Sequence, residues 1–218
     1  NDLYQINMAE TYWNDGIHER KAVFDLYFRN MPFNSGYAVF NGLKRVIEYI
    51  NNFHFSKSDI EYLKSIGYQD DFLNYLKNLS FTGSIRSMQE GELCFGNEPL
   101  LRVEAPLIQA QLIETMLLNI VNFHTLITTK ASRIRQVAHD DMLMEFGTRR
   151  AQEADAALWG ARAAYIGGFN STSNVRAGKL FGIPVSGTHA HAMVQTYGDE
   201  YIALGMYLMP LNYKLTNV

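Results

Sequence analysis

The chain contains 218 residues, of which 47% are hydrophobic, 13% aromatic and 19% charged. That composition is typical of a folded globular protein and excludes a disordered chain. The formal net charge is only −3, which argues against binding to a nucleic-acid backbone and leaves any anionic ligand to a few placed Arg or Lys side chains.

Helical and strand patterns alternate over short distances in the first hundred residues. Apolar residues recur at helical spacing in several segments, one of which follows a capping sequence at 56–59. Aromatic and β-branched runs predict strands, so this half is expected to be an α+β layer with a mostly antiparallel sheet. The predicted helices cover residues 3–15, 37–53, about 57–66 and about 71–79, and the predicted strands cover 22–28, 81–87, 92–95 and 99–104.

The single cysteine, Cys94, lies in one of the predicted strands. One cysteine cannot form an internal disulfide, and the apolar neighbours Leu93 and Phe95 favour a buried structural thiol over a nucleophile. We therefore expect a reducing compartment, with the cytoplasm as the default.

Pro106 opens the longest predicted helix, which continues to about Val137 and carries apolar residues at i, i+3, i+4 spacing. The stretch from 105 to 127 is the most apolar of the chain, but Gln, Glu, Asn and His residues interrupt it. No membrane span is expected there.

Strand and helix patterns then alternate, which predicts a parallel sheet or barrel. In such folds, ligand-binding groups collect where the strands end and the loops begin. The alternating segments are residues 142–146, 154–165, 168–172, 174–181 and 183–186.

Two of these strand ends carry groups that suit an anionic ligand. Arg149 and Arg150 follow the first strand, and a guanidinium can donate two parallel hydrogen bonds to a carboxylate or phosphate. Ser173 and Asn174 follow the second, where hydroxyl and amide groups suit phosphate or ribose oxygens. Residue type alone leaves two alternatives open, a solvated arginine pair and an ordinary helix cap.

The third strand end carries Thr188, His189 and His191. If this segment is extended, the two histidines share one face. Metal binding is disfavoured because no cysteine or acidic cluster adjoins them, whereas imidazoles bonded to the backbone, a nucleophile or a proton carrier all fit.

Six segments, in order and at the expected separations, resemble nicotinate phosphoribosyltransferases, and the resemblance covers about residues 1–203. It implies an α/β fold: an N-terminal α/β sandwich over 1–108, then the first part of an irregular β/α barrel of the type II phosphoribosyltransferase kind over 109–203. Residues 204–218 are expected to be an atypical tail unmatched to the family. The six segments are residues 2–5 (DLYQ), 33–42 (FNSGYAVFNG), 117–130 (LLNIVNFHTLITTK), 145–152 (EFGTRRAQ), 167–178 (GGFNSTSNVRAG) and 182–191 (GIPVSGTHAH).

The resemblance also implies roles for individual residues. His191 matches a histidine that ATP phosphorylates, and Tyr4 matches a tyrosine that stacks on the base from the partner subunit of a homodimer. Ser173 stands where the related nicotinamide enzyme has an aspartate, so it favours the acid substrate over the amide. The remaining nicotinate-binding positions are Phe146, Arg149 and Thr188, with Arg150, Asn174 and His189 as weaker candidates, and no residue is assigned to a metal.

The family reaction joins nicotinate to phosphoribosyl pyrophosphate, coupled to ATP hydrolysis and dependent on Mg²⁺, and it gives nicotinate mononucleotide for NAD synthesis. Because the resemblance stops near residue 203, we expect an incomplete chain with little or no activity by itself. The alternatives are a non-catalytic remnant and a relative that uses nicotinamide or quinolinate.

Overall fold

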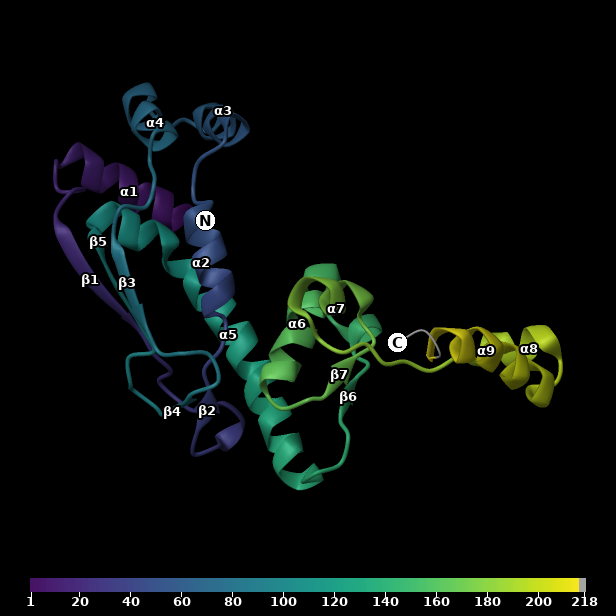
Figure 1. The fold of residues 1–218 in the computed structure, drawn as a ribbon. Helices are drawn as coiled ribbons and strands as arrows, with labels where there is room; N and C mark the ends of the chain where they lie inside the picture. Colours follow the sequence, from purple (N-terminus) through teal and green to yellow (C-terminus); the bar gives the residue numbers. More distant parts are fainter. Residues whose placement is uncertain (216–218) are drawn as a thin grey trace.

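The computed structural model describes residues 1–215, and their side chains as far as Met209. Its first half contains a three-stranded antiparallel sheet with helices against it and a separate two-stranded antiparallel pair (Figure 1). The elements of this half are α1 (Leu3–Asn14), β1 (Lys21–Leu26), the 3-10 turn η1 (Pro32–Asn34), β2 (Ala38–Val39), α2 (Leu43–Asn51), α3 (Lys57–Ser65), α4 (Asp70–Lys77), β3 (Ser84–Ser87), β4 (Leu93–Cys94) and β5 (Leu101–Pro106).

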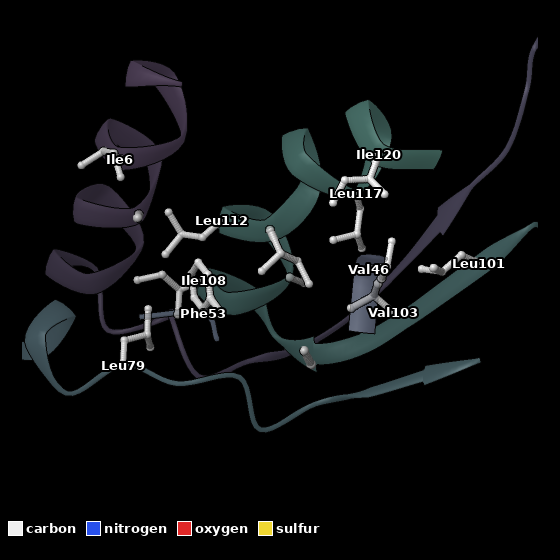
Figure 2. Packing of buried hydrophobic residues seen from close by; sticks show 14 of the residues in the cluster. Ile6, Val46, Phe53, Leu79, Leu101, Val103, Ile108, Leu112, Leu117 and Ile120 are labelled. Atoms are coloured by element: carbon white, nitrogen blue, oxygen red, sulfur yellow. The ribbon is translucent and has the colours of Figure 1, made fainter. Parts of the chain in front are cut away.

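The sheet has the order β1-β5-β3, and both pairs are antiparallel, as the sequence predicts. In β5, Leu101, Val103 and Ala105 are buried and alternate with more exposed residues, so one face of the sheet lies against the core. Figure 2 shows side chains of α1, α5 and β5, among them Ile6 and Leu112, gathered between these elements.

Local capping explains why one helix begins where the sequence predicts. The Ser56 hydroxyl accepts from the backbone N–H of Asp59 at 3.2 Å, and the Asp59 carboxylate accepts from the Ser56 N–H at 2.7 Å. This reciprocal capping box satisfies two donors at the start of α3.

The predicted helix over 37–53 is wrong in its first third, because Ala38 and Val39 form strand β2 and the helix α2 begins only at Leu43. The strand pairs with β4, and its Val39 N–H donates to the Thr129 hydroxyl at 2.9 Å. Gly42 then turns the chain with φ of 112°, a value that favours glycine. Residues far along the sequence therefore determine the conformation of residues 38–42.

Cys94 is a free, buried thiol, as predicted, and its Sγ donates to the Ala38 carbonyl at 3.5 Å. Burial raises the pKa of Cys94 to about 11. A thiol held in that state suits packing and not nucleophilic attack.

The predicted long helix is α5 (Leu107–Ala138), which begins directly after Pro106. Its first half belongs to the main core, and its second half packs along α6 (Ala154–Ile166). The predicted domain boundary at 108/109 falls within the first turn of α5. This helix packs in both halves of the chain, and the boundary stays a prediction.

The second half of the chain contains the strand-helix alternation that the sequence predicts. The strands β6 (Met144–Glu145) and β7 (Ser171–Thr172) pair in parallel, and Thr172 forms a further parallel bridge to Val185. The other elements are η2 (Thr148–Arg150), α7 (Val175–Phe181), α8 (His191–Tyr197) and α9 (Glu200–Leu215).

Helices α8 and α9 lie beside each other and extend away from the rest of the chain (Figure 1). Of the predicted tail, residues 204–215 belong to α9, and 216–218 lie outside the described residues. Among residues 1–215, no helix combines the length and the apolar character that a membrane crossing requires.

Candidate functional site

Three parallel segments end at the same edge of the small sheet formed by β6, β7 and Val185. The Ser173 N–H donates to the Glu145 carbonyl at 2.9 Å, and the Ser186 N–H donates to the Thr172 carbonyl at 3.0 Å. Phe146, Ser173 and Ser186 therefore follow strand residues that are aligned in register. Carboxyl ends of parallel strands that meet in this way are the usual place for a ligand site.

Hydrogen bonds at this edge connect the first two strand ends. The Glu145 carboxylate accepts from the Thr172 hydroxyl at 2.6 Å and from the Gly147 N–H. The Thr172 hydroxyl in turn accepts from the Asn174 N–H at 3.0 Å. Sequence reasoning missed Glu145 and Thr172 because their contact joins residues far apart in the chain.

The two arginines of the first strand end are exposed on the turn η2. Within the described part of the chain, neither Arg149 nor Arg150 lies within 4.0 Å of a carboxylate or makes a side-chain hydrogen bond. Phe146, on the same loop, is 40% exposed. This loop therefore presents uncompensated positive charge beside an accessible aromatic ring, which suits a planar anion.

The second strand end combines a capping residue with a half-buried serine. The Asn174 side-chain oxygen accepts from the Ala177 N–H at 3.0 Å, so Asn174 caps α7, as the structural alternative supposed. Ser173 lies next to it and is half-buried. The Ser173 hydroxyl adds no charge at this strand end.

The histidine segment is not extended as far as the sequence argument required. Residues 187–190 have no regular structure, and His191 is the exposed first residue of α8. The His189 ring lies 5.6 Å from the Tyr207 ring of α9, and the Thr188 hydroxyl donates to the His189 carbonyl at 3.4 Å. No bond among the described residues joins these histidines to Arg149, so their convergence stays a prediction.

Tyr4 belongs to a different part of the molecule. Its hydroxyl lies 3.4 Å from a Glu114 carboxylate oxygen and 3.3 Å from the Thr115 hydroxyl, both on the first half of α5. Helix α1 is far from β6 and β7 (Figure 1), and Tyr4 is 47% exposed. In this chain Tyr4 is therefore not brought to the strand ends, and a contribution to a partner subunit stays a prediction.

A second arrangement that sequence reasoning missed holds the opposite edge of the same sheet. The Arg135 guanidinium on α5 donates to the carbonyls of Gly168, His139 and Asp141 at 2.7–2.8 Å and to the Asn170 side-chain oxygen at 2.6 Å. The same Asn170 oxygen accepts from the Leu143 N–H at 2.8 Å. Arg135 thus fixes the segments that lead into β6 and β7, leaving the other edge to loops.

A cleft of about 590 Å³ lies between α2, α5 and α6, away from the strand ends. His124 lines it and is 3% exposed; its Nδ1 is bonded to the Ile120 carbonyl at 2.7 Å, and its Nε2 has no partner. Burial lowers the pKa of His124, and nearby Trp159 lies with its ring 5.5 Å from the imidazole. The cleft therefore has a buried imidazole in its wall, with Nε2 unpartnered among the described residues.

The chain is similar to one family model, to curated proteins and to solved structures. Residues 1–122 match the model of the nicotinate phosphoribosyltransferase (NAPRTase) N-terminal domain. Nicotinate phosphoribosyltransferase of Bacillus subtilis is 68% identical over 207 residues, which are 94% of this chain and 42% of that protein. Nicotinate phosphoribosyltransferase of Caenorhabditis elegans is 42% identical, and the match covers 99% of this chain and 39% of that protein. The crystal structure of human nicotinic acid phosphoribosyltransferase is similar with a TM-score of 0.85 and 39% identity, over 90% of this chain and 40% of that one. The chain therefore spans about two fifths of the length of these relatives.

Proposed function

The chain belongs to the nicotinate phosphoribosyltransferase family, and from that membership we propose that it supplies the nicotinate-binding part of an enzyme of this kind. The enzyme would join nicotinate to phosphoribosyl pyrophosphate and release nicotinate mononucleotide and pyrophosphate, a step in NAD synthesis. The observation that carries the proposal is the unpaired Arg149 beside Phe146 at strand ends aligned in register. The B. subtilis and human relatives, whose names state this activity, support it.

In the proposed site, Arg149 binds the nicotinate carboxylate through its planar fork of donors. Phe146 packs against the pyridine ring, and Thr188, in the irregular segment after Val185, completes the proposed contacts to nicotinate. Ser173 is neutral, so it does not repel the carboxylate as an aspartate would. With the ring fixed in this way, the pyridine nitrogen attacks the ribose C1 as pyrophosphate leaves and positive charge builds on that carbon.

No magnesium ligands are assigned in this part of the chain. Among residues 1–215, no group of three His, Cys, Asp or Glu side chains is placed to hold a metal ion. We assign no step to Mg²⁺ here and propose that it accompanies the pyrophosphate of the donor, because Mg²⁺ is commonly bound through substrate phosphates and water.

ATP is proposed to phosphorylate His191, whose imidazole is exposed at the start of α8. The phosphate would add negative charge to a segment that lies outside the main body and thereby change its contacts. His191→Ala should abolish ATP-derived phosphohistidine, whereas His189→Ala should leave it intact. Labelling that survives His191→Ala would refute this assignment.

The proposed assembly is a homodimer in the cytoplasm, in which Tyr4 of one subunit stacks on the nicotinate bound by the other. Its exposure on α1, far from its own strand ends, supports this arrangement. Tyr4→Ala should therefore weaken nicotinate binding only in the dimer, which sedimentation and calorimetry together would reveal.

Calorimetric titration with nicotinate, nicotinamide and quinolinate tests the central proposal. Nicotinate should bind best, and Arg149→Ala should weaken it by about 10- to 100-fold, the range expected for a lost hydrogen-bonded charge pair. Arg86→Ala removes the same charge from β3 of the distant sheet and should have no effect. Equal binding of nicotinate and nicotinamide, or an unaffected Arg149→Ala variant, would contradict the proposal. Binding without turnover in a complete assembly would identify a non-catalytic remnant.

A further inference from the structure

We infer that Glu145 is a positioning residue that holds the Arg149 loop in place for the carboxylate of the substrate, an inference that rests on the proposed function. Glu145 is the last residue of β6, and each of its carboxylate oxygens has a donor. One donor is the Gly147 N–H on the arginine loop, and the other is the hydroxyl of buried Thr172 on β7. The carboxylate therefore ties two strand ends together.

The glycine at position 147 leaves room for the Glu145 carboxylate where it now lies. A Cβ atom at position 147 would lie 2.7 Å from the Glu145 Oε1, closer than a real Cβ contact. The φ of Gly147 is −85°, an ordinary value for any residue, so space for the carboxylate and not backbone freedom explains the glycine. The glycine therefore leaves space for the glutamate carboxylate and also donates its N–H to it.

The hydrogen bonds of Glu145 continue through Thr172 to the next helix. The Thr172 hydroxyl gives its single proton to Glu145 and accepts from the Asn174 N–H, while the Asn174 side chain caps α7. A run of hydrogen bonds thus connects the Arg149 loop to the β7 end and to the first turn of α7. Charge-assisted bonds of this kind are stronger than neutral ones and restrict the loop accordingly.

The carboxylate acts on Arg149 through the backbone and not by pairing with it. No ion pair within 4.0 Å joins Glu145 to either arginine of η2 in the described chain. The held Gly147 directly precedes η2 as its N-cap residue, and its carbonyl accepts from the Arg150 N–H at 2.8 Å. Arg149 is therefore presented from a fixed turn with its charge still available, and such preorganisation raises affinity by lowering the ordering cost of binding.

A matched pair of substitutions at Thr172 tests this inference in the full chain. Thr172→Val keeps the shape and removes the hydroxyl, whereas Thr172→Ser keeps the hydroxyl. We expect Thr172→Val to speed hydrogen exchange of the Gly147 amide by at least about tenfold and to weaken nicotinate binding by roughly fivefold. Nicotinamide binding, which does not use the Arg149 charge in the same way, should change less, and Thr172→Ser should resemble the unmodified protein.

Glu145→Gln gives a second, independent variant, because its amide can accept from only one of the two donors and should show the same two effects. If the unmodified protein does not bind nicotinate, the proposed function fails, while the exchange of the Gly147 amide still reports on the tie. Unchanged Gly147 exchange in both Thr172→Val and Glu145→Gln would overturn the inference, as would a loss of affinity that is equal for nicotinate and nicotinamide.

Discussion

The ion pair between Glu90 and Arg162 joins the two halves of the chain, and its removal should destabilise the whole fold. Arg162 lies on α6, and its Nη2 is 2.6 Å from a carboxylate oxygen of Glu90, with the two side chains 14% and 16% exposed. The other oxygen of Glu90 accepts from the N–H groups of Gly42 and Lys44 at 3.1 Å each, at the start of α2. The pair thus connects α6 to α2.

The expected loss in the free energy of unfolding follows from the burial of both side chains. Replacing Arg162 by Met leaves the Glu90 carboxylate largely out of water with only backbone partners, and breaking a buried pair in this way costs about 3–5 kcal/mol. Because both groups retain some contact with solvent, we expect about 3 kcal/mol, the lower end of that range. Glu90→Gln should cost less, since its amide oxygen still accepts from the helix start.

The loss should also depend on pH. Burial acts to raise the pKa of Glu90, but hydrogen bonds from Arg162, Lys44 and Gly42 together hold it below its ordinary value of 4.5. A carboxyl with a lowered pKa in the folded state stabilises the fold above its ordinary pKa and loses that contribution as the pH falls through the folded value. The difference between the unmodified protein and Arg162→Met should therefore shrink in acid.

Urea denaturation followed by circular dichroism, at neutral pH and in acid, measures both effects. The matched control is Arg102→Met, which breaks the more exposed pair with Asp25, a bidentate contact at 2.7 and 2.8 Å. That variant should lose much less stability, because solvent screens the pair. If Arg162→Met were no more destabilised than Arg102→Met, the role of this pair in joining the halves would be refuted.

Three further changes test other parts of the packing. Because burial lowers the pKa of His124, the free energy of unfolding should fall as the pH drops below 6.5, and urea titrations of His124→Phe should show a shallower decline. Gly167→Ala, at the residue that follows α6, should lower the melting temperature, since its Cβ would lie 2.6 Å from the Thr128 carbonyl. Gly160→Ala, within α6, would place its Cβ 3.5 Å from the nearest side-chain atom and should raise the melting temperature by its helix propensity. Arg135→Lys should cost about 1–3 kcal/mol in thermal denaturation, because an ammonium cannot reproduce the four bonds of the guanidinium.

Local sequence was sufficient wherever local chemistry decides the structure. The capping box at Ser56 and the apolar repeat of α5 depend only on residues within a few turns, and both were predicted. The alternation after residue 142 likewise predicted parallel strands, which β6 and β7 confirm. The strand bounds differ from the prediction, because the pairing partner sets where a strand stops: the prediction is a strand over 142–146, and β6 covers Met144–Glu145.

The segment before α2 shows why elements that depend on distant partners could not be predicted from the sequence. Ala38, Val39 and Phe40 form a short apolar run that fits a helix or a strand equally well. The run becomes a strand because Leu93 and Cys94 pair with it and because Thr129 accepts a backbone proton from it. Those partners are remote in the sequence, so no local pattern contains the answer.

The small parallel sheet shows how a site is divided between what sequence motifs reveal and what only the fold reveals. The residues that we propose to bind the ligand, Arg149 and Phe146, lie in a motif that the sequence reveals because the proposed chemistry restricts their type. The residues that hold them, Glu145, Thr172 and Arg135, have ordinary side chains whose importance comes from contacts across the sheet. Arg135 fixes the edge where the strands begin, and the Glu145–Thr172 bond fixes the edge where they end, so the exposed loop starts from a rigid frame. A substitution in that frame should therefore alter ligand affinity without touching the ligand, which is the behaviour that the Thr172 pair is designed to detect.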